Sequence, residues 1–180
     1  MLHRRSFLRD IITIALFAMC PIAHAQAKES ALSDAEVEQL RDSAYFPVDR
    51  IVVFIKFLDS RSKRVQDLFA HPRQPGREQD THDLIEQFTS IADELEDNLD
   101  DYGPRHSDIR KSLPKLINAT ERWSSALKSL PDDDAYSLSR KLALESIQDL
   151  RESATSLIED QKTWFAAHSP PNEKDDTVPR

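Results

Sequence analysis

The sequence predicts an all-α protein: an antiparallel (up-and-down) four-helix bundle with a short extra N-terminal helix. Only two glycines, Gly76 and Gly103, interrupt the 180 residues, and both fall where a run of apolar periodicity stops. Elsewhere apolar residues recur at spacings of three and four, which is the pattern of helices that bury one face. Long helices of this kind that are joined by short loops favour antiparallel packing.

The first 27 residues are predicted to be an export signal. Arg4, Arg5 and Arg9 precede an apolar run at 11–19, and small residues follow as far as Ala27. The stretch from Arg4 to Arg9 resembles the twin-arginine export motif, and a general secretory peptide is the alternative. The run is about half the length that a membrane-spanning helix needs, and no comparable run follows it. We therefore expect a periplasmic or secreted protein with no membrane span in the mature chain.

Removal of this signal would leave an acidic domain without cysteine. Cys20, the single cysteine, departs with the signal, so no disulfide or thiolate ligand is expected. The net charge of −8 becomes −10 because Arg4, Arg5 and Arg9 leave with only Asp10. Such a charge repels nucleic acid phosphates, so nucleic acid is not an expected partner. Residues 28–168 are expected to form a single helical-bundle domain, and 169–180, which lack apolar periodicity, a disordered tail.

The first two helices are predicted from their start signals. Ser33 followed by Glu36 is a capping-box pattern, which opens a short helix that should end near Phe46. Pro47 fits the first turn of a second, longer helix that should reach about Ala70.

The third helix should span about 78–102, with a heptad seam on one face. On a helical wheel Asp97, Asp100 and Asp101 lie opposite this seam and should face water. We expect them to pair with the bases at 105–111, and a weak calcium site on the three acids is the alternative. The chain has no Glu-x-x-His motif of the di-metal bundles, so no metal and no cofactor are predicted.

The fourth and fifth helices complete the predicted bundle. An apolar stripe from 109 to 130 keeps its phase across Pro114, which predicts one helix kinked at that proline. The alternative is a new helix start with Ser112 as its cap. The fifth helix should begin at the aspartates 132–134, where the helix dipole favours acids, and run to about residue 168.

The half-helix 51–58 is apolar on nearly every side. Ile55 belongs to the core stripe, but Val53 and Phe57 project about 160° to 200° away from it. One explanation is that the first helix, through Val37, Leu40 and Ala44/Tyr45, folds back over this second face within the same molecule. The other is a groove for a partner, or a homodimer seam, because exposed apolar patches mark interaction sites. The predicted partner-binding residues are Val53, Phe54 and Phe57, and the partner is another protein or a second copy.

Three aromatic residues suggest a second candidate function. Trp123, Trp164 and Phe165 are interpreted as core residues, and the alternative is that they bind a small apolar ligand carried between the helices. The sequence contains no Gly-x-Ser-x-Gly nucleophile motif, and its histidines are expected to be solvated. No catalytic residue is therefore predicted.

The stretch from Asp80 to Leu116, with its pattern of helix-surface residues, resembles a family of exported bacterial all-helical proteins with no assigned activity. The resemblance implies an exported helical fold and no catalytic residues. Together these observations predict a non-enzymatic helical bundle that acts as a protein-binding or structural module.

Overall fold

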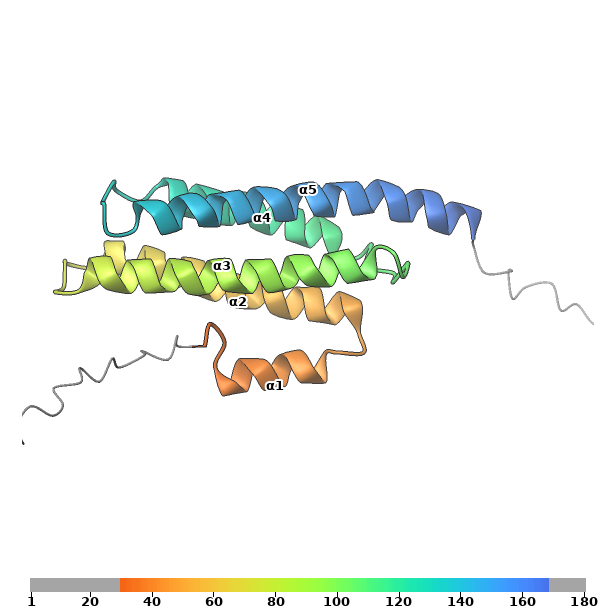
Figure 1. Cartoon of the computed structure of the whole chain (residues 1–180), viewed down its shortest axis with the longest axis horizontal. Helices are drawn as coiled ribbons and strands as arrows, with labels where there is room; N and C mark the ends of the chain where they lie inside the picture. The colour runs from red at the N-terminus through yellow and green to blue at the C-terminus, as the bar shows by residue number, and fades with distance from the viewer. Residues whose placement is uncertain (1–29, 169–180) are drawn as a thin grey trace, which may run out of the picture.

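The computed structural model describes residues 30–168, which form five α-helices and, within that range, no β-strand (Figure 1). The helices are α1 (Asp34–Asp42), α2 (Pro47–Ala70), α3 (Arg77–Tyr102), α4 (Leu113–Lys128) and α5 (Ser137–Ala167). The predicted all-α class is confirmed. The predicted export signal at 1–27 and the predicted tail at 169–180 lie outside the described residues.

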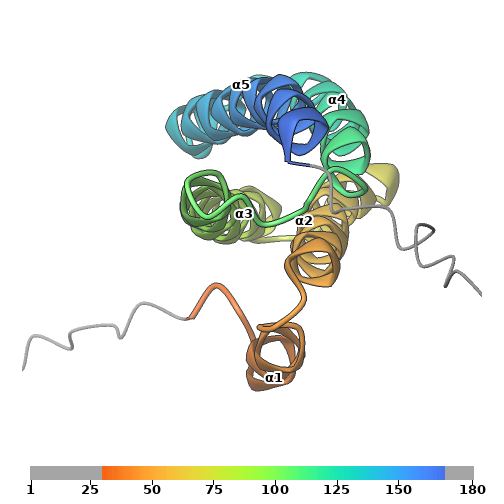
Figure 2. The same cartoon turned by 90° about the vertical axis from the view of Figure 1, so that its right-hand side faces the viewer.

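The four long helices, which we call the α2–α5 core, pack around a common centre (Figure 2). Here α2 contacts α3 and α4, and α5 contacts the same two helices. Consecutive helices alternate in direction, but α3 and α4 lie diagonally opposite, and the loop 103–112 crosses between them. As a result α2 runs parallel to α4 and α3 runs parallel to α5. The sequence expectation of antiparallel neighbours thus applies only to the pairs α2/α3 and α4/α5.

The loop 103–112 is long enough for the diagonal crossing, and a buried glutamine of α5 holds it in place. A loop of this length reaches up to roughly 30 Å when extended, which is ample for crossing a bundle. Gln161 of α5 is buried, and its Oε1 accepts a hydrogen bond from the Ile109 backbone N–H at 3.2 Å. The Nε2 of the same side chain donates to the Ser107 carbonyl at 2.7 Å. The loop is thereby attached to α5, and the N–H of the buried Ile109 obtains the partner that it needs.

The interior of the core is built from large apolar side chains of all four helices. Trp123 of α4 is almost fully buried and stands edge-on to Phe88 of α3, with ring centroids 5.5 Å apart. Its indole Nε1 donates to Asp59 Oδ1 of α2 at 2.7 Å, so one side chain connects three helices. At the end of the core where α2 finishes and α5 begins, Tyr136 packs edge-on against Phe69.

The predicted kink in the fourth helix is wrong. α4 begins at Leu113, so Pro114 lies in its first turn, where a missing N–H and a fixed φ angle cost nothing. Ser112 is the N-cap residue, as in the alternative prediction, but its hydroxyl donates to the Ile109 carbonyl at 2.9 Å and does not cap the helix. The apolar stripe continues across the break because Ile109 is buried in the preceding turn.

Two further boundaries differ from their predictions. α1 ends at Asp42, and residues 43–46 form a turn before Pro47. α5 begins at Ser137, because the preceding aspartates are used in the α4–α5 connection. Asp133 Oδ1 there accepts a hydrogen bond from the Ala135 N–H at 2.9 Å, which stabilises a turn and not the helix itself. None of the described helices combines the length and apolar character needed to cross a bilayer.

Candidate functional site

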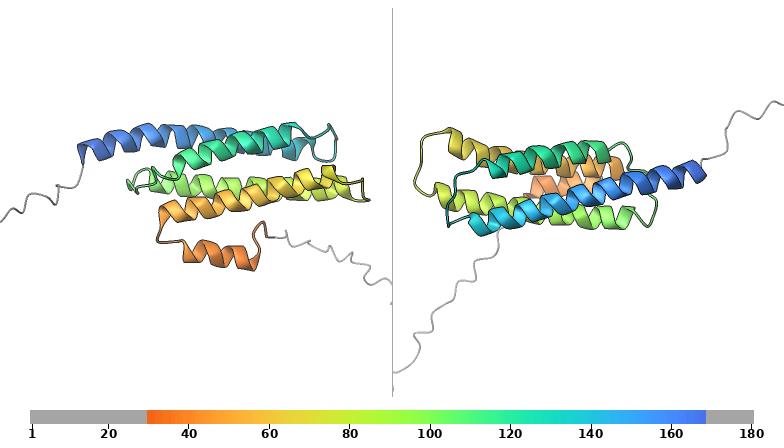
Figure 3. Two further views of the ribbon diagram at one scale, coloured as in Figure 1. Left: turned by 180° about the vertical axis from the view of Figure 1, so that it is seen from behind. Right: turned by 90° about the horizontal axis from the view of Figure 1, so that it is seen from above.

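α1 lies along α2 on the outside of the core, and α2 is the one helix of the described chain whose backbone it approaches closely (Figure 3). On α2 the residues Arg50, Val53, Phe57 and Arg61 follow one another at spacings of three, four and four, so they share one face. Both arginines of this face bind α1. The face that the sequence shows as unexpectedly apolar is therefore the face that α1 covers.

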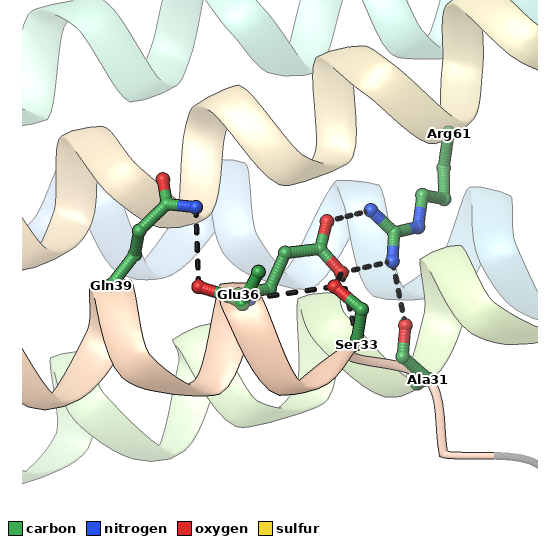
Figure 4. Close-up of polar contacts among 6 residues, drawn as sticks. Ala31, Ser33, Glu36, Gln39 and Arg61 are labelled. Atoms are coloured by element: carbon green, nitrogen blue, oxygen red, sulfur yellow. Dashed lines mark hydrogen bonds and ion pairs between the residues drawn. The ribbon is translucent and has the colours of Figure 1, made fainter.

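Arg61 forms the first of two polar contacts between the helices (Figure 4). Its guanidinium donates to both carboxylate oxygens of Glu36, and the Nη2 bond measures 2.7 Å. Nη2 also donates to the Ala31 carbonyl at 2.8 Å. Glu36 completes the predicted capping box, since its Oε2 accepts from the Ser33 N–H at 2.9 Å. One carboxylate thus both caps α1 and attaches its N-terminal end to α2.

Electrostatics strengthen this contact. The Arg61 hydrogen bonds hold the pKa of Glu36 at about 2, below its usual value of 4.5, although partial burial opposes the shift. Arg61 itself is only 6% exposed, and its Nε has no hydrogen-bond partner among the described residues. The guanidinium therefore depends on Glu36 and Ala31 for most of the compensation that its desolvation requires.

Arg50 forms the second polar contact, at the opposite end of α1. Its Nη1 donates to the Leu40 carbonyl at 2.6 Å, where the helix dipole favours a cation. Its Nε donates to Asn98 Oδ1 of α3 at 2.7 Å, and Glu94 lies 3.8 Å from Nη2. Arg50 consequently connects α1 to the core through α3 as well as through its own helix.

The apolar part of the α1 interface is small. Leu40 is the single buried residue of the nine in α1, and Ala31 and Leu32 just before the helix are partly buried. The predicted binding residues of α2 belong to, or pack against, the same apolar cluster as Leu40. Phe54 is fully buried, Phe57 is 3% exposed, and Val53 is partly buried. The structure therefore has the fold-back arrangement, and the predicted α2 surface is covered while α1 is in place.

The turn between α1 and α2 exposes two aromatic side chains. Tyr45 is 90% exposed and Phe46 is 60% exposed, although both directly precede a helix whose inner face is apolar. The sequence placed Tyr45 among the residues that cover α2, and this part of the prediction is wrong, because α1 ends at Asp42 and Tyr45 lies in the turn that follows.

The aromatic residues of the carrier alternative are not brought together. Trp123 lies in the core, whereas Trp164 stacks between His106 and His168 with centroid distances of 4.3 and 4.4 Å. Phe165 packs edge-on against Trp164, and the Arg110 guanidinium lies over its ring. Among the described residues no aromatic contact connects Trp123 with the other two.

The structure places a histidine, a serine and a glutamate together between α3 and α5. His82 Nδ1 lies 3.2 Å from Ser139 Oγ, and His82 Nε2 lies 3.4 Å from Glu86. Ser139 Oγ also donates to the Tyr136 carbonyl at 3.1 Å. Since a hydroxyl has one hydrogen, we assign Nδ1–H as the donor to Ser139, which leaves this serine without a base.

The acidic stretch at the end of α3 faces solvent, as predicted. Asp97, Asp100 and Asp101 are exposed, and Asp101 pairs with Arg105 at 2.6 Å. Arg110 pairs instead with its near neighbour Asp108, so the expected corner pairing is only partly formed. Residues 30–168 contain no group of three or more His, Cys, Asp or Glu side chains placed to hold a metal ion.

Comparison with protein-family models, with curated proteins and with solved structures finds no match for this chain. The expected membership of a family of exported helical proteins thus stays a prediction, and function must be inferred from the geometry itself.

Proposed function

We propose that this protein is an exported, non-enzymatic binding module in which α1 is a displaceable cover over the partner-binding face of α2. In this proposal the α2–α5 core is a four-helix bundle that serves as the rigid scaffold. The binding face consists of Val53 and Phe57 between Arg50 and Arg61, with Phe54 as the packed layer beneath.

The observation that carries the proposal is that α2 is the one helix of the described chain whose backbone α1 approaches closely. The attachment consists of one buried residue of α1, Leu40, the partly buried Ala31 and Leu32 just before the helix, and two arginines of α2. Full burial of a leucine contributes only about 1.5–3 kcal/mol. A buried ion pair fixes the relative position of two elements, but the desolvation of both charges offsets much of its attraction, so its net contribution to stability is small. α1 can therefore leave at a modest cost, while the core retains all of its interhelical contacts.

The bound α1 also indicates the chemistry of a partner. A competitor must offer Arg61 a carboxylate, because an unpaired buried guanidinium is costly. It must also place an apolar side chain about one turn further along, where Leu40 lies. A short amphipathic helix with a Ser-x-x-Glu start and a leucine four residues after the glutamate satisfies both requirements.

A peptide-binding experiment tests the proposal. A fluorescein-labelled peptide of residues 30–46 is titrated with the chain carrying Leu40→Asp, whose own α1 cannot bury an aspartate against α2. We expect saturable 1:1 binding, because the peptide supplies the missing leucine. The matched control is Val37→Asp, which alters a side chain of α1 that is already 40% exposed. This control and the unmodified chain should bind at least tenfold more weakly, since their attached α1 competes at high effective concentration.

A second substitution defines the site. Arg61→Ala added to Leu40→Asp should abolish peptide binding, because the peptide's glutamate then lacks its partner. If the Leu40→Asp chain keeps its helical circular dichroism but binds the peptide no better than the Val37→Asp chain does, the cover proposal is wrong.

A further inference from the structure

A second surface lies away from α1, between α3 and the start of α5. A groove of about 410 Å³ opens there, and its apolar wall consists of two leucines of α5. Leu138 is 68% exposed and Leu142 is 47% exposed, and they lie one helical turn apart. Two large aliphatic side chains exposed side by side are unusual here, because the other leucines of residues 30–168 are all buried or half-buried.

The charged groups that line this groove are nearly all acidic. They are Glu86 and Asp93 of α3, Asp134 of the α4–α5 connection, and one histidine, His82. Glu86 lies beside His82, and Asp93 accepts a hydrogen bond from Ser146 at 3.1 Å. The nearby Lys141 is directed to Glu145 at 3.7 Å and does not line the groove. The rim is therefore negative around an apolar wall.

We infer that this groove binds a cationic amphipathic helix of a partner protein. Glu86 and Asp93 are seven residues apart on α3, which is two helical turns or about 10 Å. A helix lying along the groove meets both acids when its lysines or arginines are also seven residues apart, as in the flanking charges of a coiled coil. Its apolar side chains then cover Leu138 and Leu142, so the charge pattern of the rim fixes the register of the helix.

This inference is independent of the proposed cover, because no residue of α1 or α2 lines the groove. Two residues of the groove lining, His82 and Ser139, contact each other across it. The contact attaches α3 to the first turn of α5 and keeps the two walls of the groove in place.

Fluorescence anisotropy tests the inference on the full chain. The probe is a labelled helix-forming peptide with leucines on one face and flanking lysines seven residues apart, and the matched probe has glutamates in place of the lysines. We expect 1:1 binding of the cationic peptide only, weakening as salt rises. Leu138→Asn with Leu142→Asn should weaken binding at least tenfold without altering the fold, because both side chains are exposed. Glu86→Lys with Asp93→Lys should also weaken binding of the cationic peptide at least tenfold, because the two acids that attract its lysines are replaced by like charges.

Control variants separate a groove from general attraction to an acidic protein. Val52→Asn changes an exposed apolar residue of α2, and Glu152→Lys changes an exposed acid of α5 outside the groove. Both should bind the peptide as the unmodified chain does. Equal loss in the Glu152→Lys variant, equal binding of the anionic peptide, or unchanged binding after the leucine substitutions would each overturn the inference. So would a homodimer in analytical ultracentrifugation that the leucine substitutions dissociate, because the groove would then be a self-interface.

Discussion

The α1–α2 interface and the α2–α5 core bury side chains in very different ways. In the core, Trp123 alone connects three helices through an aromatic contact and an indole hydrogen bond. At the α1 interface, one leucine is buried, and arginines at both ends supply the remaining specific contacts. The comparison teaches that the position of α1 is specified by polar geometry, whereas the core is stabilised by apolar burial. The two regions should therefore respond to different perturbations.

The largest expected effect comes from breaking the core. Trp123→Ala removes the aromatic packing on Phe88 and leaves Asp59 without its indole donor. We expect a loss of about 3–5 kcal/mol in the free energy of unfolding, measured by urea denaturation. A loss below about 1 kcal/mol would show that the tryptophan is not the central packing element described above.

An intermediate effect should be confined to α1. Glu36→Gln keeps the size of the side chain but removes the charge that compensates Arg61, which should weaken α1 attachment by about 1–3 kcal/mol. Amide NMR resonances of α1 would report this, while those of the core should remain in place. Glu38→Gln is the matched control, because Glu38 is exposed and pairs with Arg41 inside α1. Similar changes in both variants would contradict the role assigned to Glu36.

A smaller and purely local effect is expected at the far end of α5. Trp164→Ala removes the two stacking contacts with His106 and His168, each of the kind worth about 0.5–1.5 kcal/mol. Because Trp164 is only partly buried, the total cost should be well below that of Trp123→Ala. Amide exchange should rise in the loop 103–112 and not in α1, and a change in α1 would mean that the two regions are coupled.

The last expected effect is a pH dependence of opposite sign in the two regions. The lowered pKa of Glu36 stabilises α1 attachment above about pH 4.5, and this contribution is lost as the pH falls toward 2. Glu96 of α3 has a raised pKa because of burial and the nearby carboxylates of Asp149, Asp100 and Asp93. The free energy of unfolding of the core should therefore decrease as the pH rises above 4.5, because Glu96 ionises less readily in the folded chain. Below pH 4.5 this decrease is absent.

Methyl NMR of Leu40 and urea denaturation separate the two titrations. As the pH falls from 7 to 4.5, protonation of Glu96 should raise the free energy of unfolding of the core while α1 stays attached. α1 should detach only in stronger acid. Glu96→Gln should remove the first dependence and Glu36→Gln the second. Detachment of α1 that begins above pH 5 in the unmodified chain would be inconsistent with the Arg61–Glu36 contact.

Sequence patterns predicted the helices well but could not predict their lateral order. The capping box at Ser33, Pro47 in a first turn and the seam of α3 all depend on neighbouring residues, so local rules suffice for them. The loop that joins the diagonally placed α3 and α4 is bonded by Gln161, whose partners are more than fifty residues away in the chain. Periodicity alone carries no information about such a contact.

The candidate site shows the same division. The second apolar face of α2 was visible in the sequence, and its cover by α1 was one of two explanations. Arg61 was not identified, because an arginine near a helix end is usually solvated and its partner Glu36 already had a local role as a cap. The spacing of Arg50 and Arg61 on the face of Phe57 is the signal that could have revealed it.

Native-state hydrogen exchange measured by mass spectrometry on the unmodified chain tests the central claim most directly. If α1 is a separable cover, its amides should exchange through an opening of lower free energy than those of α2, α3, α4 and α5, with the core still closed. Exchange of α1 and the core through one common opening, with the same free energy and the same denaturant dependence, would contradict the account.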